Sequence, residues 1–382
     1  MKHLASLVSP LIFIFVFCAA SCAQDSRLVR IRLSDGDTMT GKLDLPGGSS
    51  GIRELVIFVH GTGPCTYLDR RKMSGLEFDY FALFTRELTG RGIAFFTYSR
   101  RGVTLSNTPP TFDTVDRKKF QKYLPSVEVK DIGTAIGFLK KEERLKKSKI
   151  VLLGWSEGTI LAPMIALDKA NKVDALLLAG YANDNMTEII KWQLGGGSSM
   201  INFCKYLDAD SNGMINRAEY ESTEKRATSF REKGLKNAPF SVLDANKDSL
   251  LTAQDFWLLN SKHYEKITEA FEKHDDDWIW NNYFHVTSAW YAEHKMLEAN
   301  NTRLMKLDIP IYIFQGMEDA STPASGAIEI QKRFAQANKT NLHCFFFPKH
   351  NHDLNYTDWP LKQIISPGLQ KIFETMNILQ TR

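Results

Sequence analysis

Residues 151–159 read Val-Leu-Leu-Gly-Trp-Ser-Glu-Gly-Thr, and this stretch decides how the chain is interpreted. An apolar run ends at Gly154, and a helix-compatible segment begins at Thr159. At such a junction between strand and helix, any side chain larger than hydrogen at Gly154 or Gly158 is expected to collide with the neighbouring backbone. The tight turn should strain Ser156 and expose its hydroxyl near a helix N-terminus, where negative charge is favoured.

The pattern alone leaves two interpretations open. Gly-x-Ser-x-Gly occurs by chance in many proteins, and a serine after a strand can simply cap the following helix. The rest of the chain has to decide between a helix cap and a reactive serine.

Composition bounds the size and broad class of the protein. The chain has 382 residues, of which 43% are hydrophobic, so one large α/β domain with an insertion, or two domains, can form. The net charge is only +4, and charges of both signs are interspersed. No nucleic-acid partner is therefore expected.

The N-terminus is predicted to be a targeting segment. Lys2 precedes an apolar run over 7–20, which is followed by small residues and is too short to span a bilayer comfortably. Residues 1–23 fit a signal peptide, whereas 1–21 fit a lipoprotein signal that leaves Cys22 lipidated. The lipobox-like Ala-Ala-Ser-Cys has Ala in place of the usual Leu. The protein is expected to be exported, and to be periplasmic, secreted or lipid-anchored at the cell envelope; an uncleaved anchor is the alternative.

Three further cysteines, Cys65, Cys204 and Cys344, are scattered along the chain. They do not form a disulfide framework, although one pair could form, and their spacing does not suit a metal.

Strands and helices are predicted to alternate along most of the chain. A hairpin is expected over 26–45, with a turn at Asp35-Gly36-Asp37. Helical spacing is found at Phe78, Phe81, Phe84 and Leu88, again over 129–139, and over 369–379. Apolar runs predict strands over 54–59, 93–98, 150–153, 173–179, 309–314 and 343–347. This alternation indicates an α/β fold with a mostly parallel sheet and helices on both faces.

The alternation of strands and helices is interrupted once. Between Gly180 and Asp308 the patterns are helical, without a convincing strand of the main sheet. This stretch is too long for a connection and is expected to be an inserted domain.

The chain resembles the α/β-hydrolase fold, in which nucleophile, acid and histidine follow one another along the sequence. The resemblance covers a core of 26–180 and 305–382, with 181–304 as a helical lid. It makes Ser156 the nucleophile, and the Gly-x-x-Asp spacing after the strand at 309–314 makes Asp319 the acid. Glu318 and Asp184 are rival acids, and a solvated loop carboxylate is the plain alternative.

The histidine of the same resemblance should follow the last strand. The segment Phe347-Pro348-Lys349-His350-Asn351-His352-Asp353-Leu354 offers two candidates. His352, followed by an acid and Leu, matches the loop of such hydrolases better than His350.

An oxyanion formed at Ser156 needs two aimed backbone donors. The residue after the nucleophile, Glu157, supplies one N–H. The segment His60-Gly61-Thr62-Gly63 resembles the oxyanion loop of the fold, so the N–H of Thr62 is the second candidate, with His60 structural. The loop Tyr98-Ser99-Arg100-Arg101-Gly102 resembles an Asp-x-Arg-Gly loop with Ser99 in place of Asp, and is expected to be scaffold or pocket rim.

The resemblance implies a serine hydrolase that cleaves carboxylic esters through an acyl-enzyme, with a small-molecule ester or acyl compound as substrate. A serine peptidase, aminopeptidase-like, is the first alternative; Asp275–Asp277 or Glu293 could bind its substrate's amino group. A non-catalytic calcium-dependent binding protein is the second. Fold analogy cannot separate these.

The insertion carries a second motif. Residues 208–219 resemble the twelve-residue EF-hand calcium loop at every defining position, with Gly213 at the sharp turn. A polar loop between helices is the plain alternative. Ca²⁺ would take oxygen ligands from Asp208, Asp210, Asn212, Met214 (carbonyl), Asn216 (directly or through water) and Glu219.

The pattern repeats 36 residues later, over 244–255. This loop departs twice, because Ser249 replaces Gly and Asp255 replaces the long Glu, so the site should be weak or Mg²⁺-like. Ile215 and Leu251 are expected to join the two loops in a short β bridge. A structural ion that fixes the lid is expected. The ligands would be Asp244, Asn246, Asp248, Leu250 (carbonyl), Thr252 and Asp255.

An aromatic-rich stretch follows the second loop. It favours a packed core within the lid, with an apolar pocket wall as the alternative. Its members are Trp278, Trp280, Tyr283, Phe284, Trp290 and Tyr291.

Overall fold

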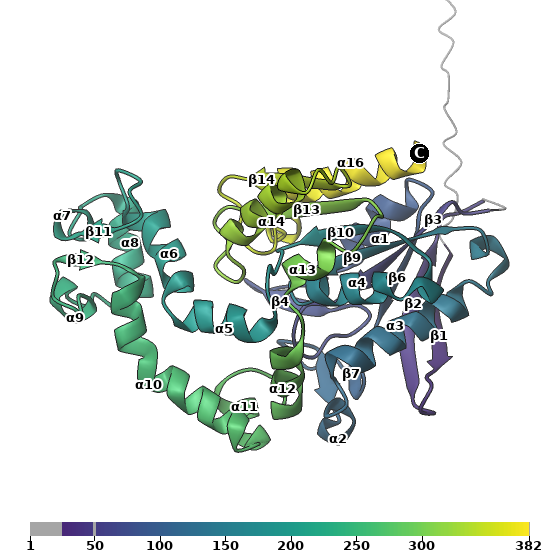
Figure 1. Ribbon diagram of the computed structural model, residues 1–382, viewed down its shortest axis with the longest axis horizontal. Helices are drawn as coiled ribbons and strands as arrows, with labels where there is room; N and C mark the ends of the chain where they lie inside the picture. Colours follow the sequence, from purple (N-terminus) through teal and green to yellow (C-terminus); the bar gives the residue numbers. More distant parts are fainter. Residues whose placement is uncertain (1–24, 49–50, 382) are drawn as a thin grey trace, which may run out of the picture.

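The computed structural model describes residues 25–48 and 51–381, so the predicted targeting segment and Cys22 lie outside the described residues. An eight-stranded sheet runs through the molecule in the order β1-β2-β6-β3-β9-β10-β13-β14 (Figure 1). Its members are β1 (Asp25–Arg32), β2 (Thr38–Leu45), β3 (Glu54–Val59), β6 (Ala94–Tyr98), β9 (Lys149–Trp155), β10 (Val173–Ala179), β13 (Ile311–Gly316) and β14 (Leu342–Phe347).

Strand direction follows the sequence pattern. The hairpin β1–β2 is antiparallel, β2 pairs antiparallel with β6, and the pairs from β6 to β14 are parallel. Strand β3 is buried along its whole length, which is why it appears in the sequence as a continuous apolar run. The predicted, mostly parallel sheet is confirmed.

Helices cover both faces of the sheet (Figure 1). Side chains alternate along β3, so Leu55 and Ile57 join one hydrophobic cluster and Val56 and Phe58 join another on the opposite face of the sheet. The helices outside the insertion are α1 (Ala82–Thr89), α2 (Arg117–Phe120), α3 (Pro125–Leu139), α4 (Gly158–Leu167), α14 (Ala324–Gln336), α15 (Asp358–Lys362) and α16 (Pro367–Thr381), with short 3₁₀ turns at Glu143–Leu145 and Lys169–Asn171.

Two small hairpins were not expected from the sequence. Strands β4 (Arg70–Met73) and β5 (Leu76–Asp79) form one, and β7 (Val103–Leu105) and β8 (Asp113–Val115) form the other. The helical spacing that began at Phe78 was therefore wrong at its first residue, because Phe78 lies in β5. The helix starts only at Ala82.

Between β10 and β13 the chain forms a helical arm, residues 181–304, which adds no strand to the eight-stranded sheet. Figure 1 shows α6 (Gly197–Leu207) to α10 (Ala253–Glu272) standing away from the sheet, whereas α5 (Met186–Leu194), α12 (Ser288–Met296) and α13 (Asn300–Leu304) lie beside it. The elements of the arm are α5 (Met186–Leu194), α6 (Gly197–Leu207), β11 (Ile215–Asn216), α7 (Arg217–Tyr220), α8 (Lys225–Gly234), α9 (Phe240–Leu243), β12 (Leu250–Leu251), α10 (Ala253–Glu272), α11 (Asp276–Asn282), α12 (Ser288–Met296) and α13 (Asn300–Leu304).

The arm contains two hydrophobic clusters. Its far part has a cluster of its own around Phe203, Tyr220 and Phe256. Its near part, including Ile190 and Trp290, shares a cluster with the core of the molecule. The far part therefore has the means to stay folded without close support from the sheet.

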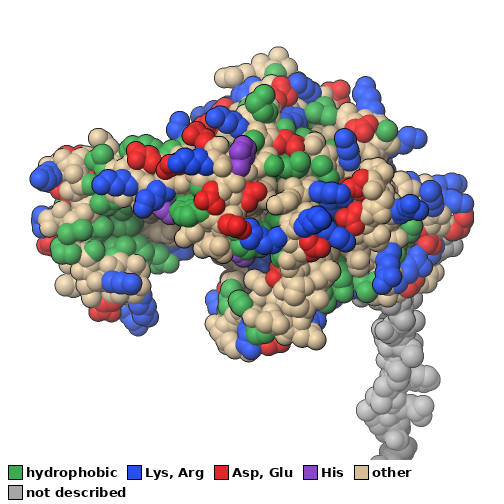
Figure 2. Space-filling view, turned by 90° about the horizontal axis from the view of Figure 1, so that it is seen from below, with side chains coloured by type: hydrophobic (Ala, Val, Ile, Leu, Met, Phe, Trp, Pro, Cys, Tyr) green, Lys and Arg blue, Asp and Glu red, His purple; other side chains and the backbone are tan. Residues whose placement is uncertain are grey.

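Cys65, Cys204 and Cys344 are free thiols, so no disulfide joins the described cysteines. Over residues 25–48 and 51–381, every helix is too short or too polar to cross a membrane. Figure 2 shows basic and acidic side chains interspersed on the face it presents.

Candidate active site

Ser156 stands in a strained turn between β9 and α4. Its φ is +55°, a left-handed conformation that residues other than glycine rarely adopt. The flanking glycines allow the turn: a Cβ on Gly154 would lie 2.4 Å from the carbonyl oxygen of Gly158, and one on Gly158 would lie 2.0 Å from that of Val59. The backbone therefore lifts the serine above the carboxyl end of the sheet, where ligands of parallel α/β sheets bind.

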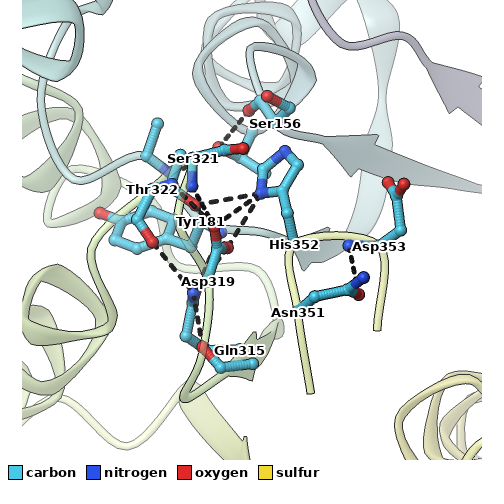
Figure 3. A network of polar contacts seen from close by, with 12 residues as sticks. Ser156, Tyr181, Gln315, Asp319, Ser321, Thr322, Asn351, His352 and Asp353 are labelled. Atoms are coloured by element: carbon cyan, nitrogen blue, oxygen red, sulfur yellow. Dashed lines mark hydrogen bonds and ion pairs between the residues drawn. The ribbon is translucent and has the colours of Figure 1, made fainter. Parts of the chain in front are cut away.

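His352 and Asp319 lie against each other beside this turn. The imidazole Nδ1 is 2.9 Å from Oδ2 of Asp319 and 3.0 Å from Oδ1. In Figure 3 the ring of His352 lies between Asp319 and Ser156. The three residues, far apart in sequence, are thus brought together on the loops after β9, β13 and β14.

The carboxylate of Asp319 is fully buried and fixed by its own loop. The backbone N–H groups of Ser321 and Thr322 each donate to Oδ1 at 2.8 Å, and the hydroxyl of Thr322 donates to Oδ2 at 2.8 Å. The side-chain amide of Gln315 donates to Oδ2 at 2.9 Å. Burial opposes ionisation, but His352 and these donors hold the pKa of Asp319 below its ordinary value.

The rival residues from the sequence have other partners. Glu318 lies 2.7 Å from the ammonium of Lys205, and His350 Nδ1 lies 2.9 Å from the carbonyl oxygen of Pro348. Asp184 accepts the backbone N–H of Asn185 at 2.8 Å. The geometry therefore selects Asp319 and His352 as the pair next to Ser156.

His352 keeps 20% of its side chain exposed. Burial disfavours the charged imidazolium, but the carboxylate of Asp319 outweighs this and raises the pKa of His352 above its ordinary value. Gly180, at φ +59°, packs directly beneath the ring, and a Cβ there would lie 2.6 Å from Cε1 of His352.

The two expected backbone donors flank Ser156. Within the described chain, neither the N–H of Thr62 nor that of Glu157 donates to a backbone or side-chain acceptor of the protein. The loop of Thr62 lies close to the serine, since a Cβ on Gly61 would be 3.2 Å from Cβ of Ser156. His60 is buried with Nε2 2.7 Å from the carbonyl oxygen of Tyr98, and burial lowers its pKa to about 3. His60 is thus a neutral side chain of the scaffold.

A cavity of about 340 Å³ opens over Ser156 and His352. One part of its lining is apolar and comes from the arm, namely Met186, Ile190, Tyr283, Phe284, Val286 and Trp290. The aromatic stretch is therefore divided: Phe271 stacks on Tyr291 at 4.0 Å in the packed cluster, whereas Tyr283, Phe284 and Trp290 reach the cavity.

Another part of the lining is charged and was missed from the sequence. Asp69, Arg71 and Asp353 all line the cavity, and Arg71 pairs with Asp69 at 2.6 Å. Arg71 belongs to the unexpected hairpin β4–β5, and its guanidinium lies 4.3 Å from the ring centre of Tyr80. The Ser74-Gly75 turn is the signal that could have revealed this hairpin.

The carboxylates considered for binding an amino group have different roles. Asp275 caps α11, Asp276 accepts the N–H of Ser288, and Asp277 pairs with Arg117. Glu293 accepts the backbone N–H of Ser126 at 2.6 Å. These four carboxylates are not among the cavity-lining residues, so this part of the peptidase interpretation was wrong.

The loop over 208–219 brings acidic oxygens together in the far part of the arm. Asp208, Asp210 and Glu219 each place one carboxylate oxygen within 4.8 Å of the others. The loop is already bent around these groups: Asp208 accepts the N–H of Gly213 at 2.9 Å, and Glu219 accepts that of Asn216 at 3.0 Å. The donor set is the hard-oxygen type that Ca²⁺ prefers.

The loop over 244–255 has the same backbone course. Ser249 adopts φ +70° where the first loop has Gly213 at +81°. The expected bridge is present, since Ile215 pairs with Leu251. Asp255 accepts the N–H of Thr252 at 2.8 Å, as Glu219 does for Asn216 in the first loop.

Residues 54–357 match the family described as the alpha/beta hydrolase fold, and the chain belongs to this family. No curated protein matches it. Similar solved structures include a carboxyl esterase from Bacillus coagulans (13% identity, 92% of this chain and 98% of that one, TM-score 0.50) and Est1E from Butyrivibrio proteoclasticus (12%, 93% and 99%, TM-score 0.49). A third is a candidate dipeptidyl aminopeptidase IV from Bacteroides ovatus (11% identity, TM-score 0.48). The match covers 94% of this chain but only 36% of that one. At these identities the likenesses concern the fold alone.

Proposed function

We propose that the chain is a serine hydrolase that cleaves carboxylic esters, with Ser156, His352 and Asp319 as its catalytic residues. One observation carries the proposal: the His352–Asp319 pair at 2.9 Å lies beside a strained serine at the floor of a 340 Å³ cavity. A helix cap needs neither the left-handed turn nor a buried carboxylate–imidazole pair. A residue with a strained backbone and a side chain that faces a cavity is typical of a reacting group.

The reaction would follow the acyl-enzyme course. Neutral His352 takes the proton of Ser156 as the serine oxygen attacks the acyl carbon, and Asp319 stabilises the imidazolium that forms. The carbonyl oxygen becomes an oxyanion, which the N–H groups of Thr62 and Glu157 would bind. His352 then protonates the leaving alkoxide, and water, activated by the same histidine, hydrolyses the acyl-enzyme.

The cavity supports an ester with an apolar acyl or aryl group. Tyr283, Phe284 and Trp290 offer an aromatic wall, whereas Asp69 and Arg71 offer polar contacts elsewhere in the lining. Orientation of a substrate by one apolar wall and a few polar groups is usual for such sites.

Hydrolysis of a p-nitrophenyl ester series, from acetyl to long acyl chains, tests the proposal. Turnover should vanish in Ser156→Ala, which should also lose labelling by a fluorophosphonate. Folded wild-type protein that is labelled yet cleaves no ester in the series would contradict the ester assignment, and aminoacyl substrates would then be assayed.

A serine peptidase of the same fold is the second candidate. The observation in its favour is that two carboxylates, Asp69 and Asp353, line the cavity and could bind an amino group. Because Asp69 already pairs with Arg71, only Asp353 is available without rearrangement. Faster turnover of aminoacyl p-nitroanilides than of esters, lost in Asp353→Asn, would favour this candidate. A non-catalytic calcium-dependent binding protein, by contrast, should not react with the fluorophosphonate at all.

We further propose that the loop over 208–219 holds Ca²⁺, and that 244–255 holds a second ion more weakly. The clustering of Asp208, Asp210 and Glu219 supports the first site, because a divalent cation would neutralise carboxylates that otherwise repel one another. The second site has Asp255, with a shorter side chain, in the place of Glu219. Calorimetric titration should give one tight and one weak site, with the tight site lost in Glu219→Gln.

Export of the protein is proposed from residues 1–23 alone. Mass spectrometry of the mature N-terminus would distinguish cleavage before Gln24 from a lipid-modified Cys22.

A further inference from the structure

Two buried charged side chains lie under the nucleophile turn and take no part in the proton transfers above. The side chain of Arg100 is 1% exposed, that of Glu157 is 0% exposed, and their closest nitrogen and oxygen atoms are 3.8 Å apart. Burying charges is costly unless they are paired and hydrogen-bonded, so both groups are expected to have close polar partners.

Arg100 binds the backbone on both sides of Thr62. Its Nη1 donates to the carbonyl oxygens of Gly61 at 2.5 Å and Gly63 at 2.6 Å, and its Nη2 donates to that of His60 at 3.2 Å. Three carbonyl groups of one short loop are thus held by one planar guanidinium, whose donors are fixed relative to one another. These three hydrogen bonds fix the direction of the Thr62 N–H.

Glu157 is held just as firmly on the other side. Its carboxylate accepts hydrogen bonds from the hydroxyl of Tyr123, from the indole Nε1 of Trp290 at 2.8 Å, and from Nε2 of His294 at 2.9 Å. Burial disfavours its charge, but the donors, His294 first among them, lower its pKa to about 2. Because Glu157 directly follows Ser156, fixing its side chain also fixes its backbone N–H.

Tyr123 connects the two halves. Its hydroxyl bonds Glu157, while its ring lies under the guanidinium of Arg100, 4.2 Å from ring centre to Cζ. Glu128, a second carboxylate, accepts from Nε of Arg100 at 2.7 Å. One continuous network therefore reaches both backbone donors expected to stabilise the oxyanion.

We propose that Arg100 and Glu157 are positioning residues that hold the N–H groups of Thr62 and Glu157 in place for the oxyanion. The inference rests on the proposed serine-hydrolase function. Donors lower the barrier only if they are already aimed at the place where charge develops, so loosening the network should slow chemistry more than it weakens substrate binding.

The neighbouring residue provides a matched control. Arg101 also has a buried ion pair, with Asp131 at 2.6 Å, and its side chain is 6% exposed. Its second partner is Asp35 at 2.9 Å, in the turn after β1. Arg101→Gln thus removes a comparable buried charge without touching the loop of Thr62.

The experiment compares Arg100→Gln with Arg101→Gln after counting active sites with a fluorophosphonate. Per titrated site, Arg100→Gln should lower kcat by about 100-fold, as the loss of one oxyanion donor does, and leave KM within about threefold. Arg100→Lys keeps the charge but not the planar set of guanidinium donors. Its kcat should therefore lie between that of Arg100→Gln and that of the wild type. Arg101→Gln should lose thermal stability and keep kcat within about threefold of wild type.

Inhibition by a trifluoromethyl ketone distinguishes a positioning role from a purely structural one, because a purely structural role would leave its inhibition constant unchanged. Ser156 adds to its carbonyl carbon, the serine proton passes to His352, and the ketone oxygen becomes the bound oxyanion. The inhibition constant should therefore rise with the loss in kcat for Arg100→Gln and stay unchanged for Arg101→Gln.

Tyr123→Phe covers the case in which Arg100→Gln does not fold. It deletes only the hydroxyl that bonds Glu157, and should lower kcat by about tenfold, the cost of one charge-assisted hydrogen bond, at constant KM. If the variant that folds keeps wild-type kcat per titrated site and wild-type inhibition by the ketone, the positioning role is overturned. Wild-type protein that neither turns over esters nor reacts with the fluorophosphonate would instead overturn the hydrolase function itself.

Discussion

Gly180 shows how closely the backbone approaches the proposed base. It has φ +59°, and a Cβ there would come within 2.6 Å of Cε1 of His352. Gly180→Ala should push the imidazole away from Ser156 and lower kcat by about 100-fold, the scale expected for a misplacement of about 1 Å. Steady-state kinetics on a p-nitrophenyl ester measure this.

Gly92→Ala is the control for backbone strain at this site. Gly92 has φ +78° but nothing within 4 Å of an added Cβ. Gly92→Ala should lose about 1 kcal/mol of unfolding free energy, from forcing a side chain into a left-handed conformation, and Gly180→Ala should lose more because its Cβ also displaces His352. Equal activity of the two variants would mean that the close approach beneath His352 does not matter.

The pH dependence of turnover should follow the ionisation of His352. The base must be neutral, and Asp319 raises the pKa of His352 above its ordinary 6.5. Activity should therefore be lost as the pH falls, with the midpoint of the acidic limb of kcat/KM above 6.5. In Asp319→Asn the charge that favours imidazolium is gone while the burial remains, so the midpoint should move to lower pH and kcat should fall by about 10⁴-fold. An unchanged midpoint in this variant would assign the limb to another group.

At the scale of single residues, the sequence predicts part of the candidate site. Ser156, Asp319 and His352 could be named because each follows a strand and the order along the chain is informative. The contacts of Glu157 could not, since its partners Trp290 and His294 lie 133 and 137 residues away and their periodicity shows only a packed helix. Arg100 was interpreted as scaffold for the same reason.

Individual elements show a second limit of the sequence pattern. The apolar strands of the sheet were predicted because burial on both faces leaves continuous hydrophobic runs. The hairpin β4–β5 was missed because its first strand, Arg70 to Met73, is mostly charged and half exposed. Two of its four cross-strand pairs, Arg70 with Asp79 and Lys72 with Glu77, are ionic rather than apolar. Elements held by polar pairs and a turn leave little periodic signal, even where they line a cavity.

The loop over 244–255 carries a backbone strain that the loop over 208–219 avoids. Ser249 occupies φ +70° where Gly213 occupies +81° in the first loop. Ser249→Gly should relieve the strain and stabilise the arm by about 0.5–1 kcal/mol, after allowing for the greater freedom of glycine in the unfolded chain. Thermal unfolding in EGTA, followed by tryptophan fluorescence, measures the change.

Gly213→Ser is the reciprocal variant. It should destabilise the arm by a similar amount, because it introduces the same strain into the first loop. Changes of the same sign in both variants would mean that side-chain contacts, not backbone conformation, distinguish the two loops.

The whole molecule combines an α/β-hydrolase core with an arm whose far part has a separate hydrophobic cluster. The far part of the arm has its own hydrophobic cluster, and hydrophobic side chains gather on the end of the arm in Figure 2. Three hydrophobic side chains of the far part of the arm, Val242, Leu258 and Leu259, are between 45% and 57% exposed. Such a part can lose stability without unfolding the sheet.

The contact between the far part of the arm and the candidate active site determines how strongly calcium should affect turnover. Lys205, just before the first loop, pairs with Glu318, the neighbour of Asp319, at 2.7 Å. The two side chains are 35% and 23% exposed, and ion pairs with that exposure contribute about 0–1 kcal/mol. EGTA should therefore lower the unfolding midpoint of the arm clearly, yet reduce kcat by no more than about fivefold, the rate equivalent of 1 kcal/mol. Lys205→Met should abolish the effect of EGTA on kcat and keep its effect on unfolding, because only the contact with the acid loop is removed. A loss of turnover beyond 100-fold in EGTA would contradict this, and would mean that the far part of the arm shapes the cavity itself rather than touching it through one exposed pair.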